Sequence, residues 1–506
     1  MFTELRAHTA FSFGDGAVSP EALARRARRL GYTHLGITDC ADLGGIAKFA
    51  VEAMAPSKDP ECRCVAEHER LGKSDCPVCQ RPVQPIVGVE LEIDGQPAAF
   101  IARNPEGYRN VAALVTLARV GDWERWEKPE QAKRRGRPGI SWEQLTEHAR
   151  GLHALTGPAN GPLASRVRAG DQVNAKRLLN EWREVFGEHL SVETQLHYVG
   201  GHEAALAGEL IALAEKNGVG WLTTNDPRYV DEGGRLVHDV LTALRHETDL
   251  ATAMERGWLR PNGEWRLRSP RAMAHRWRGR LEGLRESERI VASCDDFTLD
   301  WMRPPMPDFG RIQRDADRLR DDNEFLRTLA YEGAKVRWGD PLSEAQVRQI
   351  DHELVLIAKL GFPGFFLVMA DAIRFARSQG ILCQGRGSAA NSAVCYALGI
   401  TNADAVSLGL LFERFLSPER DGPPDIDIDI ESDRREEAIQ YVYERYGREN
   451  AAQVANVITY RPKSAVRDMA KALGYSMGQL DAWSKQVDGW GPLSATAGQP
   501  DHDIPE

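Results

Sequence analysis

Six short apolar segments recur along the first 285 residues of this 506-residue chain, and their spacing constrains the fold most strongly. They lie at residues 2–5, 34–39, 85–91, 153–157, 190–193 and 219–226. Helical or polar stretches separate them, beginning with an amphipathic basic run at 20–30. Such alternation predicts parallel strands in an α/β fold, and a barrel is one way to close them. Functional residues of a barrel lie at the carboxyl ends of its strands, where Asp39, Glu90 and Asp226 occur.

A second feature is the run Asp-Ile-Asp-Ile-Asp-Ile at residues 425–430. A period of two is strand spacing, so Asp425, Asp427 and Asp429 share one face. Carboxylates gathered in this way repel one another unless a cation neutralises them. Two metal ions about 4 Å apart are the usual means of stabilising both oxygens in a phosphoryl displacement. A solvated acidic edge strand is an alternative, whereas a calcium loop is disfavoured because Ile430 would stand where that loop needs glycine.

A glycine-rich turn, Gly385-Arg386-Gly387-Ser388, lies upstream of the aspartates. It follows a short apolar strand and precedes a helix of small residues, which is the layout of a phosphate cradle. Glycines let the backbone approach the ligand, and free N–H groups at a helix start point at the anion. The run lacks the Gly-Lys-Ser/Thr of a Walker A loop, and an ordinary turn is the alternative. The cradle and the carboxylate strand together predict nucleotidyl transfer.

Composition limits the class of protein. The chain is too long for one ordinary domain, and 42% hydrophobic with 27% charged residues is typical of globular proteins. Apolar runs are too short for a membrane span, and charges within the first six positions do not fit a signal peptide, so we expect a cytoplasmic location. The net charge of −10 argues against non-specific coating of nucleic acid but allows a local basic groove.

Four of the eight cysteines cluster in one short segment, as Cys62, Cys64, Cys76 and Cys79. In a cytosolic chain this spacing favours a metal over disulfides. We predict a zinc knuckle in an insertion at residues 56–84, with tetrahedral thiolate ligation that folds a loop too short for its own core. His68 is an alternative ligand, and free or redox-active thiols are the alternative interpretation.

The second half resembles the palm of bacterial C-family DNA polymerases, the family of the DNA polymerase III alpha subunit. The likeness rests on residues 361–368, 383–401, 411–420 and 424–429. Two sequence motifs resemble those of the error-prone translesion branch, the ImuC type. They are Cys-Gln-Gly-Arg-Gly-Ser-Ala-Ala-Asn-Ser at 383–392 and Pro-Glu-Arg-Asp-Gly-Pro-Pro at 418–424.

This resemblance implies roles for the residues of both motifs. Asp425 and Asp427 would bind two Mg²⁺ ions, with Asp429 as nearby support. Gly387 and Ser388 would cradle the triphosphate of the incoming nucleotide. The implied cations that neutralise its charge are Arg386, Arg414 and Arg420.

The first half resembles the PHP domain, a metal-dependent phosphoesterase-type barrel that opens C-family polymerases. The family's metal site is built mainly from histidines and is eroded here, because Arg6, Cys40 and Arg228 stand where the pattern has histidine. Arginine cannot ligate a metal and adds positive charge where a cation would bind. We expect a structural scaffold without hydrolytic activity, and a partial site holding one ion is the alternative. The degenerate site comprises His8, Asp15, Asp39, Cys40, Glu90 and Asp226.

These resemblances divide the chain into a PHP-like barrel (1–285), a palm (290–456) and the start of a helical thumb (457–506). In the thumb, Lys463 and Arg467 lie four residues apart on one helix face, as contacts to DNA phosphates would. A solvated basic face is the alternative. The family's fingers, remaining thumb and clamp-binding parts would follow residue 506, so we expect the N-terminal portion of a longer polymerase.

The expected activity is error-prone, template-directed transfer of deoxynucleotides to a primer 3′-hydroxyl during DNA repair or damage tolerance. Expected partners are primer–template DNA, deoxynucleoside triphosphates and, through parts beyond this chain, a sliding clamp and translesion accessory proteins. The replicative alpha subunit is an alternative within the family. A PHP-type phosphoesterase or nuclease and a non-catalytic binding module are alternatives from other classes, and the lost histidines count against the first of these.

Overall fold

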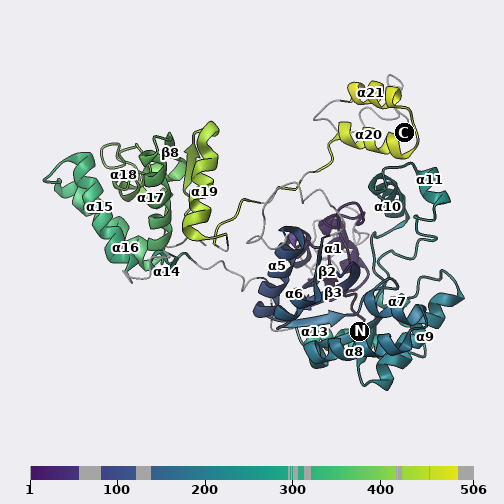
Figure 1. The fold of residues 1–506 in the computed structure, drawn as a ribbon. Helices are drawn as coiled ribbons and strands as arrows, with labels where there is room; N and C mark the ends of the chain where they lie inside the picture. Colours follow the sequence, from purple (N-terminus) through teal and green to yellow (C-terminus); the bar gives the residue numbers. More distant parts are fainter. Residues whose placement is uncertain are drawn as a thin grey trace, which may run out of the picture. The chain divides into compact units, whose positions relative to one another are not determined.

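A computed structural model describes most of the chain and divides it into two compact units, residues 1–302 with 459–506 and residues 303–458. Figure 1 shows the elements of each unit. The described residues are 2–55, 81–120, 138–294, 297, 299, 306–312, 321–417, 419, 424–448, 450–454, 456–457 and 459–487.

The first unit is built on one sheet, which has seven strands in the described part of the chain. Its strands are β1 (His34–Ile37), β2 (Gln84–Ile93), β3 (Gln96–Ala102), β4 (Gly139–Ile140), β5 (Leu152–Leu155), β6 (Leu190–Thr194) and β7 (Gly220–Thr223). Their order is β1-β2-β3-β5-β6-β7, with β4 paired to β2. The predicted strands at 34–39, 85–91, 153–157, 190–193 and 219–226 are thereby confirmed as β1, β2, β5, β6 and β7.

The prediction of parallel strands throughout is wrong at β3, which runs antiparallel to both β2 and β5. Asp94 and Gly95 connect β2 to β3 and have φ values of 50° and 82°. Positive φ at both central residues is the signature of a type I′ hairpin turn, for which Asp-Gly is a preferred pair. This dipeptide was therefore the sequence signal for the hairpin.

The N-terminal segment links the two edges of this sheet. Ala7 N–H donates to the carbonyl of Gly36 in β1, and Thr38 N–H donates to the carbonyl of Ala7. His8 N–H donates to the carbonyl of Pro227, just after β7. Residues 2–5, predicted as a strand, are therefore extended beside β1 without being one of the named strands. This placement carries residues 6 and 8 to the carboxyl ends of the strands.

Helices accompany the strands of the first unit. The basic helix predicted at 20–30 is confirmed as α1, where Ser19 caps the N-terminus by accepting a hydrogen bond from Ala22 N–H. Helix α1 spans Pro20–Arg29. The other helices are α2 (Gly44–Met54), α5 (Pro105–Val120), α6 (Trp142–Glu147), α7 (Pro162–Arg168), α8 (Gln172–Phe186), the 3₁₀ turn η4 (Gly187–His189), α9 (Gly201–Lys216), α10 (Glu232–Arg245), α11 (Leu250–Glu255), α12 (Pro270–Arg276) and α13 (Glu282–Ala292).

Two C-terminal helices also belong to the first unit, α20 (Pro462–Ala472) and α21 (Met477–Gln486). Ala472 of α20 is fully buried in one apolar cluster with Val240 and Ala243 of α10. Their assignment to a thumb stays a prediction.

The second unit is mostly helical, as expected for residues 320–380. Its elements are α14 (Phe309–Ile312), α15 (Asp322–Trp338), α16 (Glu344–Lys359), α17 (Pro363–Ser378), β8 (Cys383–Arg386), η6 (Gly387–Asn391), α18 (Ala393–Ala397), η7 (Phe412–Arg414), β9 (Asp427–Ile430), η8 (Ser432–Arg434) and α19 (Arg435–Tyr446). Ile350 and Ile357 of α16 and Phe366 of α17 are buried in its core. These helices support the small β8–β9 sheet that carries both sequence motifs (Figure 1).

Among the described helices, none is by itself long and apolar enough to cross a membrane. Only α16 and α17 taken together reach that length and composition, and they are bent by 117° where they meet.

Candidate active site

The glycine-rich turn and the aspartate strand meet in one antiparallel ladder. Strand β8 pairs with β9 so that Arg386 stands opposite Asp427, Gly385 opposite Ile428 and Gln384 opposite Asp429. Alternation along β9 exposes Asp427 and Asp429 and turns Ile428 toward the core of the second unit. Tertiary structure thus brings together two motifs that lie far apart in the sequence.

Asp425 precedes β9 and is exposed, while Ile426 beside it is buried. The buried isoleucine fixes the face on which the neighbouring carboxylates lie. Carboxylate oxygens are the ligands that Mg²⁺ prefers, so Asp425 and Asp427 offer suitable donor atoms. Among the described residues, however, the group of three ligand atoms close enough to hold one ion is that of His8, Cys40 and Glu90 and not one on this strand.

Asp429 has a different environment from Asp427. Its Oδ2 lies 3.2 Å from Nε of Arg386, and both side chains are well exposed. An exposed ion pair of this kind contributes little stability and can exchange partners. Gly387, which follows Arg386, has φ of +68°. A Cβ atom at this position would lie 3.4 Å from Oδ2 of Asp427. The turn therefore passes close to the carboxylate of Asp427.

The start of helix α18 is occupied by a buried carboxylate. Glu353 of α16 accepts hydrogen bonds from Ser392 Oγ at 2.7 Å, Ala393 N–H at 2.8 Å and Val394 N–H at 2.9 Å. Burial raises the pKa of Glu353, although these donors act in the opposite direction. This carboxylate takes the N–H groups at the start of α18, so those groups are not free to bind a phosphate.

A phosphate cradle in this turn would use the backbone of η6 instead. The opening residues of a helix have N–H groups without an intrahelical acceptor, and Gly387 and Ser388 open η6. Arg414 ends η7, which contacts η6, so its exposed side chain belongs to the same region of the unit. Arg420 lies outside the described residues, as do Cys62, Cys64, Cys76 and Cys79 of the predicted zinc knuckle.

The predicted DNA contacts lie in the other unit. Lys463 and Arg467 are both exposed on α20. Arg467 is paired with Asp481 of α21, with Nη1 2.8 Å from Oδ1. The structure therefore does not bring these cations together with the aspartate strand within one unit.

At the strand ends of the first unit, a buried arginine lies among three carboxylates. Nη1 of Arg6 lies 2.8 Å from Glu193, Nε lies 3.2 Å from Asp226, and Nη2 bonds Glu90. The Arg6 side chain is fully buried. Burial alone would raise the pKa of Asp226, but Arg228 and Arg6 outweigh it and hold the pKa well below the usual range. Arg6 thus supplies the positive charge that these carboxylates require.

A second arginine completes this neutralisation. Nη1 of Arg228 lies 2.5 Å from Asp15, and Nη2 lies 3.0 Å from Asp226. Asp15 is also 3.3 Å from Arg245. Every carboxylate of the degenerate site that faces Arg6 or Arg228 therefore has a guanidinium partner.

His8 and Cys40 of the degenerate site converge on Glu90. The possible ligand atoms of His8, Cys40 and Glu90 lie within 4.8 Å of one another, which is close enough to hold one ion. His8 Nε2 is 3.1 Å from Asp226, and Cys40 Sγ is 3.2 Å from Glu90. A site for several metal ions does not fit, because two guanidinium groups occupy the space between the carboxylates.

Asp39 is separate from this cluster despite its position after β1. Its carboxylate accepts hydrogen bonds from Thr9 N–H at 2.6 Å, Thr9 Oγ1 at 2.7 Å and Ser12 Oγ at 2.7 Å. Burial raises its pKa. Asp39 therefore holds the 9–12 turn, which carries the His8 side chain through a 3.1 Å contact between Nδ1 and Ser12 Oγ.

Sequence reasoning missed Glu193 and Glu353. Glu193 lies at the carboxyl end of a predicted strand, so the rule that selected Asp39, Glu90 and Asp226 would also have selected it. Glu353 lies on a helix remote in sequence from the turn that it supports, and no local pattern indicates that contact.

Comparison with known proteins agrees with both halves of this architecture. Residues 324–502 match the family described as the bacterial DNA polymerase III alpha NTPase domain, and residues 4–197 match the PHP domain. The error-prone DNA polymerase of Mycobacterium bovis is 43% identical over 498 residues, which cover 97% of this chain and 42% of the relative. That of Nocardia farcinica is 41% identical over 536 residues, covering 100% of this chain and 45% of the relative.

The chain thus spans less than half the length of these curated relatives. Among solved structures, an amidohydrolase from Chromobacterium violaceum is 17% identical and covers 45% of this chain and 87% of its own. Its TM-score of 0.29 is too low to support an argument.

The chain therefore combines a PHP domain with a bacterial DNA polymerase III alpha NTPase domain. Over nearly its whole length the chain is similar to error-prone DNA polymerases.

Proposed function

We propose that this chain is part of an error-prone DNA polymerase that transfers deoxynucleotides to a primer 3′-hydroxyl by two-metal catalysis in the cytoplasm. The observation that carries the proposal is the β8–β9 ladder, which places Arg386 and Gly387 beside Asp427. A metal-binding carboxylate next to a phosphate-binding turn is what nucleotidyl transfer requires.

In this proposal Asp425 and Asp427 hold two Mg²⁺ ions, which stabilise the attacking and leaving oxygens when bound. Gly387 and Ser388 approach the triphosphate through their backbone. Arg386 leaves Asp429 to pair with a phosphate, since an exposed ion pair costs little to break. The further cations would be Arg414 and Arg420.

The proposed partners follow from this chemistry. The substrates are primer–template DNA and deoxynucleoside triphosphates, with Lys463 and Arg467 as contacts to DNA phosphates. A clamp and translesion accessory proteins would bind parts of the polymerase outside this chain. Zinc bound by Cys62, Cys64, Cys76 and Cys79 would be structural, and the barrel would be a scaffold held by Arg6 and Arg228 in place of metal ions.

Primer extension with Mg²⁺ tests the proposal, with this chain placed in a polymerase of the relatives' full length. Asp427→Asn is expected to lower incorporation about 10³-fold or more, because several kcal/mol of metal-dependent stabilisation are lost. Asp433→Asn, an equally exposed aspartate in η8, is the matched control and should leave incorporation unchanged. Normal incorporation by Asp427→Asn would refute the assigned role.

The same assay distinguishes a nuclease or phosphoesterase activity of the barrel. Phosphate release or DNA degradation that survives Asp427→Asn but disappears in Glu90→Gln would place activity in the first unit. The two arginines between the carboxylates argue against that outcome.

A further inference from the structure

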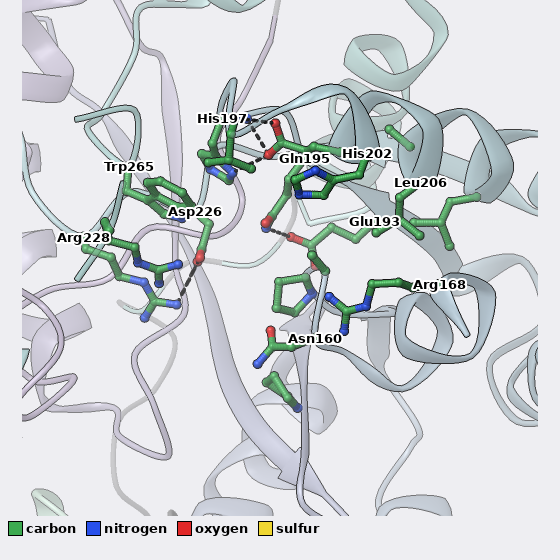
Figure 2. Close-up of a pocket in the computed structure, with 18 of the residues that line it drawn as sticks. Asn160, Arg168, Glu193, Gln195, His197, His202, Leu206, Asp226, Arg228 and Trp265 are labelled. Carbon is green, nitrogen blue, oxygen red and sulfur yellow. Dashed lines mark hydrogen bonds and ion pairs between the residues drawn. The ribbon is translucent and has the colours of Figure 1, made fainter. Parts of the chain in front are cut away.

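Two arginines of the second unit differ from the matched arginines of the first. Arg6 and Arg228 each pair with carboxylates, and Figure 2 shows Arg228 joined to Asp226 at the edge of a pocket. Arg337 in the last turn of α15 and Arg377 in the last turn of α17 have no such match. Among the described residues, neither of their guanidinium groups forms an ion pair with a carboxylate.

The guanidinium groups of Arg337 and Arg377 converge above Gly399, just after α18. A Cβ atom at Gly399 would lie 2.6 Å from Nη1 of Arg377 and 3.6 Å from Nη2 of Arg337. Gly399 has φ of 77°, and the missing side chain leaves the space that Arg377 occupies. Two like charges therefore lie close together, which is unfavourable unless an anion binds both.

Neutral groups hold Arg337 in this position. Its Nη1 and Nη2 each donate to Oδ1 of Asn402 at 3.2 Å, and the guanidinium group lies 4.7 Å from the centroid of the Tyr396 ring. Asp404 of the same loop accepts a hydrogen bond from Trp338 Nε1 at 2.8 Å instead. An amide and an aromatic ring orient a guanidinium group without cancelling its charge, so the charge is available to a ligand.

Hydrogen bonds connect this arginine pair to the sheet that carries the aspartates. Asn402 Nδ2 donates to Oε1 of Gln384 at 2.6 Å, and Gln384 stands opposite Asp429 in the β8–β9 ladder. Residues directly opposite in an antiparallel pair share one face, so Gln384 lies on the face of the aspartates. Gly385 N–H donates to the carbonyl of Ile400 at 2.7 Å. The loop that holds Arg337 therefore runs beside β8, on the edge away from β9.

We propose that Arg337 and Arg377 together bind a backbone phosphate of the DNA strand that crosses the solvent face of the β8–β9 sheet. This site rests on the proposed function, because DNA is the substrate of that polymerase. The aspartates make the face acidic, so a DNA strand lying over it needs cations beyond them. Guanidinium groups bind phosphate oxygens with well-defined geometry, and such contacts position DNA without reading its sequence.

The location of the pair favours DNA over the triphosphate of the incoming nucleotide. Gln384, through which the pair reaches β8, precedes the proposed cradle at Gly387 by three residues, or about 10 Å of extended chain. The loop of Asn402 lies a further strand spacing away, about 4.8 Å. A DNA strand carries one phosphate for each 3.4 Å or so of helix axis, so a phosphate at this distance belongs to another nucleotide of the strand.

Fluorescence anisotropy of a labelled primer–template duplex would measure DNA binding by this chain over a range of salt concentrations. A chelator in the buffer excludes binding through metal ions at the aspartates. Arg377→Gln should weaken binding about tenfold at fixed salt, and equally for two duplexes of unrelated sequence. The double variant with Arg337→Gln should lower the slope of log K against log salt by about 0.9, which corresponds to one lost phosphate contact.

Arg348→Gln is the matched control. Arg348 is exposed on α16 of the same unit, and its Nε donates to the carbonyl of Glu344, so its substitution removes the same charge without touching the pair. Arg377→Lys keeps the charge and should retain most of the salt slope. Arg377 is exposed, and its guanidinium group bonds no other described residue, so Arg377→Gln tests the site even if Arg337→Gln fails to fold.

Three results would overturn the proposal. The unmodified chain could fail to bind the duplex at low salt, or Arg377→Gln could bind it as tightly as Arg348→Gln. In primer extension by the full-length polymerase, Arg377→Gln could raise the KM for the deoxynucleoside triphosphate and leave the salt slope for DNA unchanged, which would place the pair at the triphosphate. Normal incorporation by Asp427→Asn, with weakened DNA binding by Arg377→Gln, would refute the proposed catalytic site and still support this phosphate contact.

Discussion

Glu353 is expected to determine the stability of the turn that carries the proposed nucleotide site. Its carboxylate is fully buried and accepts three hydrogen bonds from the start of α18 and a fourth from Gln349 at 2.9 Å. Glu353→Ala would leave the N–H groups of Ala393 and Val394 and the Ser392 hydroxyl without this acceptor. Each buried donor without a partner costs about 1–3 kcal/mol.

The net loss should be smaller than the sum of these costs. Removing a buried carboxylate also removes its own desolvation penalty, which is the reason that its pKa is raised. We therefore expect Glu353→Ala to lower the local stability around α18 by about 2–4 kcal/mol. Glu353→Gln keeps one acceptor oxygen and should lose about half as much.

Hydrogen exchange measured by mass spectrometry is the appropriate assay, because a chain of two units has no single unfolding free energy. Amides in peptides covering residues 387–397 should exchange about 30- to 1000-fold faster in Glu353→Ala, which is the factor equivalent to 2–4 kcal/mol. Glu332→Ala, an exposed glutamate on α15, is the control. Equal exchange in Glu353→Ala and the control would show that the buried carboxylate does not support the turn.

Three further outcomes are expected. Arg6→Met should lower the stability of the first unit by about 3–5 kcal/mol, because it leaves buried carboxylates without their cation. Calorimetry would measure this loss, and an unchanged unfolding transition would contradict the prediction. Burial raises the pKa of Glu4 to about 8, so its contribution to stability is complete below about pH 4.5 and is lost as pH rises through 8. Glu4→Gln should therefore gain stability relative to the unmodified chain between pH 5 and 8, measured by urea unfolding at both values, and parallel pH profiles would count against it. Gly385→Ala should displace β8 and cost about 1–3 kcal/mol, because the new Cβ would lie 2.4 Å from the carbonyl oxygen of Ile400; unchanged exchange of β8 amides would refute the clash.

Local sequence patterns determined much of the secondary structure of this protein. Alternating apolar segments predicted five strands of the seven-stranded sheet in the first unit, because burial on a sheet demands a recognisable period and length. The same alternation predicted that Asp427 and Asp429 share a face of β9, which the exposure of both confirms. Family resemblance carried by residues 361–429 predicted the class of polymerase, which the comparisons support.

Contacts between distant residues were decided only by the tertiary structure. The pairing of β8 with β9 brings the two motifs together, and Glu353 occupies the helix start that the sequence left for an anion. Arg6 marks an eroded metal site in the sequence, but only the fold shows its guanidinium group bonded to Glu193 as well as to Glu90. The physical reason is that buried charges and hydrogen-bond donors need partners, and the fold supplies those partners from residues far away along the chain.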